Sequence, residues 1–313
     1  MNNRNSGTIN REDVARFRNI LRTLSCNFHL FSPVITLIEQ GIENENYLVN
    51  YKNCKYVFRV YNKKKDIKEI EYELYVIKHL IKEKLKIPLL ISDVNNKHII
   101  AFEDRFAVLM SYVEGSHIPW LPISQKLAKN IAVEVFKLKI ALETIKLKRK
   151  KYMWSKFPIS NFNYELISEK KNMLEQLGNL DYSKFKKSVI HSDLSRENLL
   201  IKDHEVVAIL DFDDVTYDYY VIELANVITQ IFISGEKGVD WPALNVFWDN
   251  LKKRIFLNRS EIEALIPFML HRNFIVLSVC EQKDNYFKDI STSVINKIKY
   301  ILKDRKKICS VLK

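Results

Sequence analysis

The hydrophobic pattern of this chain changes its period once, near Gly115. Before that point, short runs alternate apolar and polar residues, as in residues 34–60 and 97–112, and such alternation predicts strands. After that point, apolar residues recur at helical spacing over long stretches, which predicts helices. A sheet-rich part therefore precedes a helical part, and we predict an α+β fold of two lobes, residues 1–115 and residues 116–313.

The sheet-rich lobe is also predicted to contain helices, and the helical lobe is predicted to contain strands. In the first lobe, a helix opens at Asn10, with acidic residues in its first turn, and an amphipathic helix covers residues 67–84. In the second lobe, residues 188–212 form a sheet-forming segment between helices. The helices predicted around it cover residues 122–147, 164–177, 221–233, 241–256, 260–278 (with Ser260 as N-cap) and 291–311.

The composition restricts the class of protein. Hydrophobic residues make up 47% and charged residues 28% of the 313 residues, which is ordinary for a globular protein and excludes disordered and collagen-like chains. No apolar run approaches the roughly 18 residues that cross a membrane, and the polar residues 1–7 are not followed by the apolar core of a secretion signal. Four cysteines without CxxC spacing indicate neither a zinc site nor disulfides. We therefore expect a cytoplasmic protein without a membrane partner.

The net charge of +12 supports two interpretations. A basic surface can bind a polyanion such as nucleic acid, a membrane or a nucleotide. Compositional drift produces the same charge, because Lys, Ile and Asn are abundant here and only 6 residues are Gly, as in genomes rich in A and T. The basic run 146–151 lacks interleaved stacking aromatics. We favour drift, and we expect a monomer or homodimer with no nucleic-acid partner.

The sheet-forming segment of the second lobe carries the residues with the most chemical information. Two short apolar strands, 198–201 and 206–210, are joined by a turn and predict a hairpin. This hairpin would bring Asn198 close to Asp211, and an amide oxygen beside a carboxylate suits Mg²⁺. Asp193 precedes the hairpin in a loop, where it is free to accept a proton from a hydroxyl.

A family resemblance appears in these residues. The pattern His191-Ser-Asp193-Leu-x-x-x-Asn198, followed by Ile-Leu-Asp211-Phe, resembles the catalytic loop and metal-binding signature of aminoglycoside phosphotransferase-type small-molecule kinases. Homoserine and choline kinases are members of the same protein-kinase-like superfamily. The usual form has Gly in place of Ser192. Without this joint pattern, the same side chains read as ordinary turn and strand-end residues.

The resemblance implies a bilobal protein-kinase-like fold, with a small antiparallel sheet lobe that binds the nucleotide and a large helical lobe that carries the catalytic loop and the substrate pocket. It implies that Asp193 is the catalytic base and that Asn198 and Asp211 hold Mg²⁺. Glu223 stands where the family commonly has an Asp that braces the catalytic loop, which leaves this bracing open. Asp213 is either a second contact to metal or substrate, or a turn cap.

The same resemblance assigns residues of the first lobe to ATP. Gly41 and Asn44 lie in a segment similar to the loop over the phosphates in homoserine kinases, although the segment also reads as a plain β-turn. Arg59 stands where protein kinases have the phosphate-binding lysine; its alternative is an exposed strand cation. Ser111 and Val113 lie in the segment whose backbone would meet adenine.

A glutamate is expected to pair with Arg59. Glu73 is our choice from the family's register, which the resemblance supplies, because it precedes the apolar stretch of this helix; Glu71 is the alternative on another helical face. Either glutamate could instead be a solvated helix charge.

The activity that the resemblance implies is an ATP- and Mg²⁺-dependent O-phosphotransferase acting on a hydroxyl of a small, amine-bearing molecule. Two alternatives stay open: a homoserine kinase, and a catalytically silent kinase-like structural protein. The acceptor pocket is expected in the helical lobe, and Arg272 would suit an acceptor with a carboxylate. Candidates chosen by position alone are Trp241, Trp248, Arg272, Glu281 and Asp284.

Overall fold

The computed structural model describes residues 11–38, 44–120, 122–149, 166–282 and 288–313. The chain divides into two compact units, which are treated separately below. Unit 1 comprises Met1–Tyr72 and Pro88–Val113, and unit 2 comprises Glu73–Ile87 and Glu114–Lys313.

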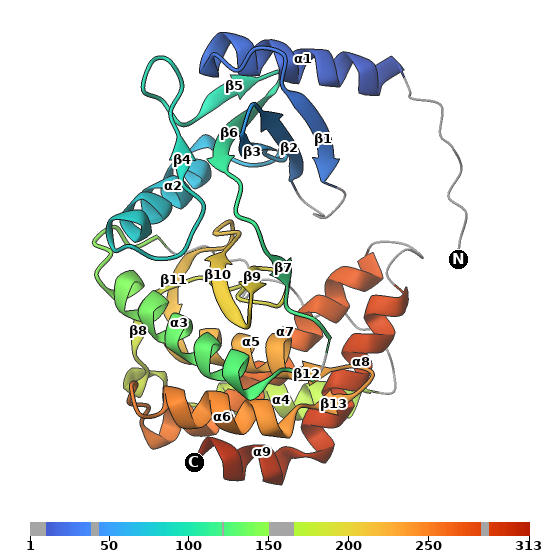
Figure 1. Ribbon diagram of the computed structural model, residues 1–313. Helices are drawn as coiled ribbons and strands as arrows, with labels where there is room; N and C mark the ends of the chain where they lie inside the picture. The colour runs from blue at the N-terminus through green and yellow to red at the C-terminus, as the bar shows by residue number, and fades with distance from the viewer. Residues whose placement is uncertain (1–10, 39–43, 121, 150–165, 283–287) are drawn as a thin grey trace. The chain divides into compact units, whose positions relative to one another are not determined.

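Unit 1 is built on an antiparallel sheet with strand order β1-β2-β3-β6-β4, to which β5 adds by pairing with β6. The helix α1 packs on this sheet through Ile20 and Leu24, which are fully buried against Phe58 and other strand side chains (Figure 1). The hydrophobic core of unit 1 therefore lies between α1 and the sheet. The elements are α1 (Arg11–Phe28), β1 (Val34–Ile38), β2 (Glu45–Tyr51), β3 (Cys54–Val60), β4 (Leu90–Ile91), β5 (Ile100–Phe102) and β6 (Arg105–Ser111). The helix α2 (Ile67–Lys82) begins in unit 1 and continues into unit 2.

Unit 2 is mainly helical and holds three small antiparallel sheets. Its helices are α3 (Gln125–Glu143), α4 (Ile167–Gly178), the 3₁₀ turn Tyr182–Lys184, α5 (Tyr220–Phe232), α6 (Trp241–Leu251), α7 (Arg259–Gln282), α8 (Lys288–Lys303) and α9 (Arg305–Leu312). Its strands are β7 (Ser116–His117), β8 (Lys187–Ile190), β9 (Leu199–Lys202), β10 (Glu205–Ile209), β11 (Thr216–Tyr219), β12 (Ile233–Ser234) and β13 (Gly238–Val239).

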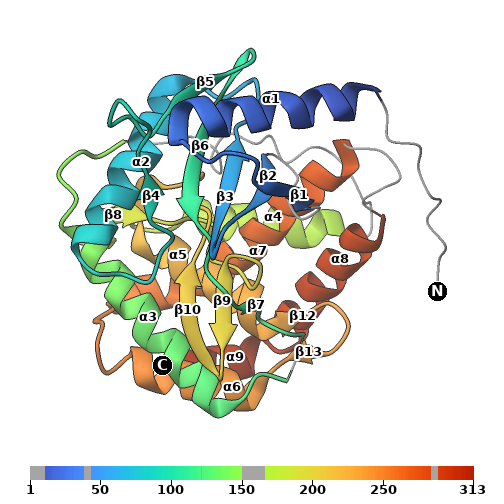
Figure 2. The same cartoon turned by 45° about the horizontal axis from the view of Figure 1, so that its top comes forward.

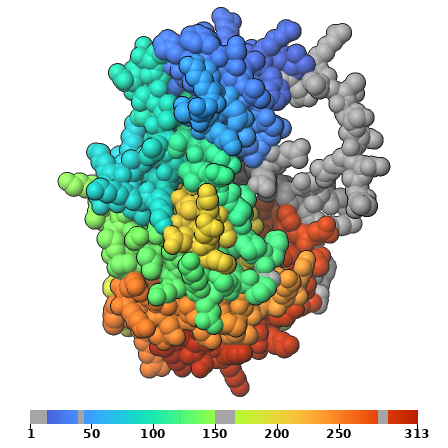
Figure 3. All heavy atoms as spheres, viewed as in Figure 1, coloured from blue at the N-terminus to red at the C-terminus, as the bar shows by residue number. Residues whose placement is uncertain are grey.

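The predicted hairpin is present as β9 and β10, which pair antiparallel, while β7 pairs with the other edge of β9. The helix α3 runs beside the hairpin (Figure 2), and its Asn130 side chain accepts a hydrogen bond of 2.7 Å from the Val206 amide. At the opposite end, the turn of residues 202–205 is exposed and forms the yellow patch on the surface in Figure 3. The hairpin is thus held along both strands, by β7 and by α3, and its turn is exposed.

Gly115 lies against the same hairpin. A Cβ atom at this position would lie 3.0 Å from Val207 Cγ2 and 3.1 Å from the Ile201 carbonyl oxygen. Glycine lets the backbone pass this close without displacing either strand, because a Cβ atom would be in tight contact with both. This contact gives a structural reason for the glycine at the point where the hydrophobic period changes.

Several predicted helix boundaries differ from the structure: the helix predicted over residues 122–147 is α3 (Gln125–Glu143), and the one predicted over residues 241–256 ends at Leu251. The helix α7 is capped by Asn258 and not by Ser260: Asn258 Oδ1 accepts from the Glu261 amide at 3.0 Å, and Glu261 accepts from the Asn258 amide at 2.9 Å. This reciprocal pair is a capping box placed two residues earlier than predicted. The helix predicted over residues 291–311 is two helices, α8 and α9, which meet at Asp304.

Among the residues that the structure describes, one helix is long and apolar enough, by length and composition, to cross a membrane. This segment, Arg259–Cys280 in α7, has a window that is 72% buried within the structure. Such burial is also found in a core helix of a globular unit.

Candidate functional site

The loop that follows β8 is held by its histidine. His191 is fully buried, and its Nδ1 accepts a hydrogen bond of 3.3 Å from the Asp193 amide. Its Nε2 therefore carries the proton and donates to the Leu210 carbonyl at 2.9 Å. The imidazole thus ties the loop before Asp193 to the end of β10, immediately before Asp211.

Asn198 closes the other end of this loop. Its amide nitrogen donates to the Asp193 backbone carbonyl at 2.8 Å and to the Asp193 carboxylate at 3.0 Å. Because the nitrogen is used for both bonds, the amide oxygen is directed away from Asp193 and is the part of Asn198 that could bind a cation. The expected neighbourhood of Asp193 and Asn198 is therefore present, with a hydrogen bond between them.

The hairpin brings Asp211 to the same place. The Leu210 amide donates to the Asn198 carbonyl at 2.9 Å, so Asp211 follows directly after a residue bonded to Asn198. Asp211 has a φ of 62°, in the left-handed region, where the chain turns away from β10. One amide and one carboxylate fit Mg²⁺, which usually takes few protein ligands and keeps substrate phosphates and waters. Consistent with this small donor set, the part of the chain that the structure describes holds no group of three or more His, Cys, Asp or Glu suited to a metal.

The helix α5 holds the loop at Ser192. Glu223 accepts from the Ser192 amide at 2.7 Å, and Asn226 donates to the Ser192 carbonyl at 2.8 Å. Both peptide groups of Ser192 are thereby fixed by neighbouring turns of one helix. The bracing that the sequence left open is provided by Glu223, whose longer side chain reaches the loop from α5. Burial raises the pKa of the Glu223 carboxyl, and the nearby His191 opposes this shift.

Asp193 pairs with an arginine from a distant part of the chain. Arg272, on α7, is 8% exposed and its guanidinium contacts Asp193 Oδ1. Burial raises the pKa of Asp193 to about 6, and Arg272 opposes this shift while Asp214 and Asp211 add to it. A carboxyl with this pKa is ionised at neutral pH and basic enough to take a proton from a hydroxyl.

The candidate residues of unit 1 occupy the ends of strands. Arg59, half-buried on β3, donates from Nε to Asn46 Oδ1 on the neighbouring β2 at 3.1 Å. Asn44 accepts from the Asn62 amide at 3.1 Å, so the start of β2 is bonded to the end of β3. Gly41 lies outside the described residues.

Ser111 and Val113 lie at and beyond the end of β6. The Ser111 amide donates to the Leu89 carbonyl at 2.8 Å, so it is already used within unit 1. The backbone of Val113 forms no hydrogen bond with a described residue. Val113 is therefore the better placed of the two to receive a ligand through its main chain.

Burial distinguishes the two glutamates of α2. Glu73 is 1% exposed, whereas Glu71 is exposed to solvent. A buried carboxylate requires a polar or charged partner, while an exposed one does not. Glu73 is accordingly the better candidate for a structural ion pair.

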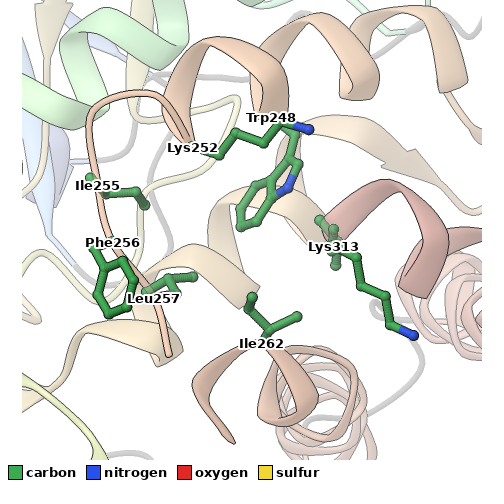
Figure 4. Close-up of a pocket in the computed structure, with 8 residues that line it drawn as sticks. Trp248, Lys252, Ile255, Phe256, Leu257, Ile262 and Lys313 are labelled. Carbon is green, nitrogen blue, oxygen red and sulfur yellow. The ribbon is translucent and has the colours of Figure 1, made fainter. Parts of the chain in front are cut away.

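The tryptophans selected by position belong to the packing of unit 2. Trp248 is 2% exposed, and Trp241 lies beneath the Lys307 ammonium, 4.0 Å from its ring centre. Trp248 lines a pocket with Ile255, Phe256 and Lys252 (Figure 4), and Asp193 is not among the residues that line this pocket. Asp284 lies outside the described residues, as does the side chain of Glu281.

Sequence reasoning missed one further charged residue beside this site. Lys297, on α8, is 7% exposed; burial lowers its pKa to about 8, Glu197 opposes this shift, and Arg272 adds to it. The one signal in the sequence was a lysine on the apolar side of an amphipathic helix, which is a weak signal because a long side chain usually reaches solvent.

Several known proteins are similar to this chain in sequence. The sequence model described as the phosphotransferase enzyme family matches residues 34–241. Among curated proteins, a hydroxylysine kinase of Bos taurus is 28% identical over 157 residues, which is 42% of each chain. A homoserine kinase of Zymomonas mobilis is 24% identical over 186 residues, covering 56% of this chain and 58% of that protein. The matched part thus spans about half the length of these relatives.

Solved structures share the fold at low identity. An amicoumacin kinase, hAmiN, in complex with AMP-PNP, Ca²⁺ and Ami has a TM-score of 0.71 at 15% identity, with 96% of both chains covered. A microcompartment-associated aminopropanol kinase has a TM-score of 0.69 at 14% identity, covering 95% of this chain and 100% of that one. These matches confirm the resemblance and the α+β, bilobal protein-kinase-like fold class indicated by the motifs.

Proposed function

The chain belongs to the phosphotransferase enzyme family, and we propose that it transfers the γ-phosphoryl group of ATP to a hydroxyl of a small, amine-bearing molecule. Residues 1–115 form the nucleotide-binding lobe in this proposal, and residues 116–313 carry the catalytic loop and the acceptor pocket. The observation that carries it is the hydrogen-bonded arrangement of Asp193, Asn198 and the end of β10.

Asp193 orients the acceptor hydroxyl and takes its proton as the bond to phosphorus forms. Its pKa of about 6 keeps the carboxylate ionised at neutral pH, and its hydrogen bond from Asn198 fixes its direction. The transition state is loose, so catalysis depends mainly on positioning and on neutralising charge.

Asn198 and Asp211 hold Mg²⁺ in this proposal. When bound, this ion neutralises charge on the phosphates and aligns them with the acceptor. The carboxylate of Asp211 and the amide oxygen of Asn198 are hard oxygen donors of the kind that this ion prefers.

The nucleotide is assigned to residues of unit 1 and α2. Arg59 binds the phosphates and Glu73 steadies it, while Gly41 and Asn44 contribute to the loop over the phosphates. Ser111 and Val113 receive adenine, chiefly through the Val113 backbone. The cytoplasm, where ATP is available, is the proposed compartment.

The test compares Asp193→Asn with Asp211→Asn. Asp193→Asn is expected to lower kcat by roughly 10²–10⁴-fold and to leave ATP affinity nearly unchanged. In this proposal the Asp193 carboxylate contacts the acceptor hydroxyl and not ATP. Asp211→Asn is expected to lower both turnover and Mg²⁺-dependent ATP affinity, because it removes charge from the cation site. ATP affinity is measured by calorimetry with and without Mg²⁺, and turnover is measured by ADP release.

Asp249→Asn is the matched control, because Asp249 is an exposed carboxylate on α6 that pairs with Lys252. It should change neither quantity. Equal loss of ATP binding in Asp193→Asn and Asp211→Asn would overturn the assignment of base and metal ligand.

Two alternatives are separated by the acceptors supplied. ADP release with homoserine alone, in a panel that also holds aminoglycosides, choline and amino alcohols, would identify a homoserine kinase. ATP binding without ADP release from any acceptor would favour a silent kinase-like protein.

A further inference from the structure

A buried lysine lies in unit 2 with a neutral partner. Lys297 is 7% exposed, and its ammonium donates to Gln230 Oε1 on α5 at 3.2 Å. No carboxylate lies within ion-pair distance of it in the parts of the chain that the structure describes. A buried ammonium without an anion is unfavourable, because the amide dipole replaces only part of the lost hydration.

The charges around Lys297 are mixed, and cations predominate among those within reach. Arg272 on α7 and Arg196 in the catalytic loop lower its pKa, Glu197 in the same loop raises it, and burial makes the largest contribution. The net result is a pKa of about 8, so Lys297 is mostly charged at neutral pH. Arg272 is already paired with Asp193, so Lys297 is the cation here that an additional anion would balance.

The position of Arg272 relates this region to the reacting group. Arg272 contacts the carboxylate of Asp193, and α7 packs against both α5 and α8 (Figure 1). The side chains of Gln230, Arg272 and Lys297 therefore come from three helices that pack together beside the base. An anionic group bound by these two cations would place the rest of a small molecule next to Asp193.

We propose that Lys297 and Arg272 bind the carboxylate of the acceptor, so that the substrate is a hydroxy amino acid and not a simple amino alcohol or an aminoglycoside. This inference rests on the proposed function. Glu197, exposed in the loop between Arg196 and Asn198, provides a carboxylate for the ammonium of such an acceptor.

The test uses acceptors that differ only in the carboxylate. Homoserine is compared with 3-aminopropan-1-ol, and 5-hydroxylysine with 1,5-diaminopentan-2-ol. The wild type should show a kcat/KM at least about 10-fold higher for the carboxylated member of one pair. Lys297→Met should raise KM for that acceptor by roughly 10–100-fold and leave kcat/KM for the decarboxylated partner unchanged.

Two further variants separate binding from a structural role. Lys297→Arg keeps the charge and should retain most of the preference, whereas Lys299→Met, at an exposed lysine of the same helix, should have no effect. Lys297→Met should also raise Tm at pH 7, because it removes a buried charge that is unbalanced in the free protein. A lysine with only a structural role would instead give a lower Tm and equal losses for both acceptors.

The outcomes distinguish the two proposals. Equal use of both members of each pair, or preference for the decarboxylated ones, overturns the carboxylate site and leaves the phosphotransferase function intact. If no acceptor supports ADP release, the proposed function fails for these acceptors. Calorimetric titration of homoserine and hydroxylysine into wild type and Lys297→Met then tests the site directly, and equal binding, or none to either, overturns it.

Discussion

Ser192 occupies a backbone conformation that favours glycine. Its φ is 75°, in the left-handed region, where a Cβ atom is strained. Its amide donates to Glu223 and its carbonyl accepts from Asn226, and these two hydrogen bonds hold it there. The family form has Gly at this position, and the structure gives the physical reason: the loop must turn sharply before Asp193. Serine is accepted here because two partners on α5 offset the strain.

This conformation makes a prediction about substitutions at Ser192. Ser192→Gly should leave stability unchanged or raise it by up to about 1 kcal/mol, because relief of strain is partly offset by the entropy of glycine. Ser192→Val should lower stability by roughly 2 kcal/mol, because a β-branched residue is more strained at this φ and the site is fully buried. Urea unfolding measures both. A Val variant as stable as wild type would contradict this account.

The pKa of Lys297 predicts that kcat/KM for a carboxylated acceptor falls at alkaline pH, which gives the pH profile an alkaline limb. The group is charged below its pKa of about 8 and neutral above it, so kcat/KM for a carboxylated acceptor should fall as pH rises through 8. Gln230, Arg196, Glu197 and Arg272 face this amine. Lys297→Arg should remove the limb, and any fall that remains belongs to the amine of the acceptor.

At the scale of elements, α5 acts as the support of the catalytic loop. Glu223→Gln keeps an oxygen that can accept from the Ser192 amide, so stability and turnover should be largely retained. Glu223→Ala leaves that buried amide without an acceptor, which should lower stability by roughly 1–3 kcal/mol and reduce kcat while ATP affinity is kept. Chemical unfolding and ADP release measure these effects. Equal behaviour of the Gln and Ala variants would show that the hydrogen bond has no role.

The sequence predicted the longer helices and strands better than the ends of helices and the short strands that connect elements. The hairpin β9–β10 follows from two apolar runs and a turn, and it correctly brought Asn198 beside the end of β10. The capping box at Asn258 was missed because Ser260 offers the same local pattern two residues later. The two-residue strand β7 was missed because its pairing with β9 depends on tertiary contact at Gly115.

Residues distant in sequence could not be placed beside the site. The ion pair of Arg272 with Asp193 joins residues 79 positions apart, and nothing in either local pattern specifies it. Arg272 was selected for its charge and its lobe, and its contact with the base became visible only in the fold. Lys297 was not selected at all, since burial decides its importance and periodicity alone does not reveal burial.

At the scale of the whole molecule, each unit has its own core and should respond separately to damage. Leu24 on α1 is fully buried in the core of unit 1. Leu24→Ala should lower the stability of this unit by about 2–5 kcal/mol, because it leaves a cavity against the sheet. Hydrogen exchange should then accelerate in β2 and β3 and stay slow in β9 and β10. Equal acceleration in both sets of strands would show that the units unfold as one.

The connectivity of the loop and hairpin has a consequence for how such a chain can diversify. Asp193, Asn198 and Asp211 lie on one short continuous stretch that closes on itself through His191 and Leu210. Arg272 and Lys297 lie on two later helices, α7 and α8, which are outside the stretch that the His191–Leu210 hydrogen bond closes. Phosphoryl transfer and the choice of acceptor are therefore encoded in separate segments. New acceptors could be acquired by substitutions in α7 and α8, while the stretch that performs the chemistry is inherited unchanged.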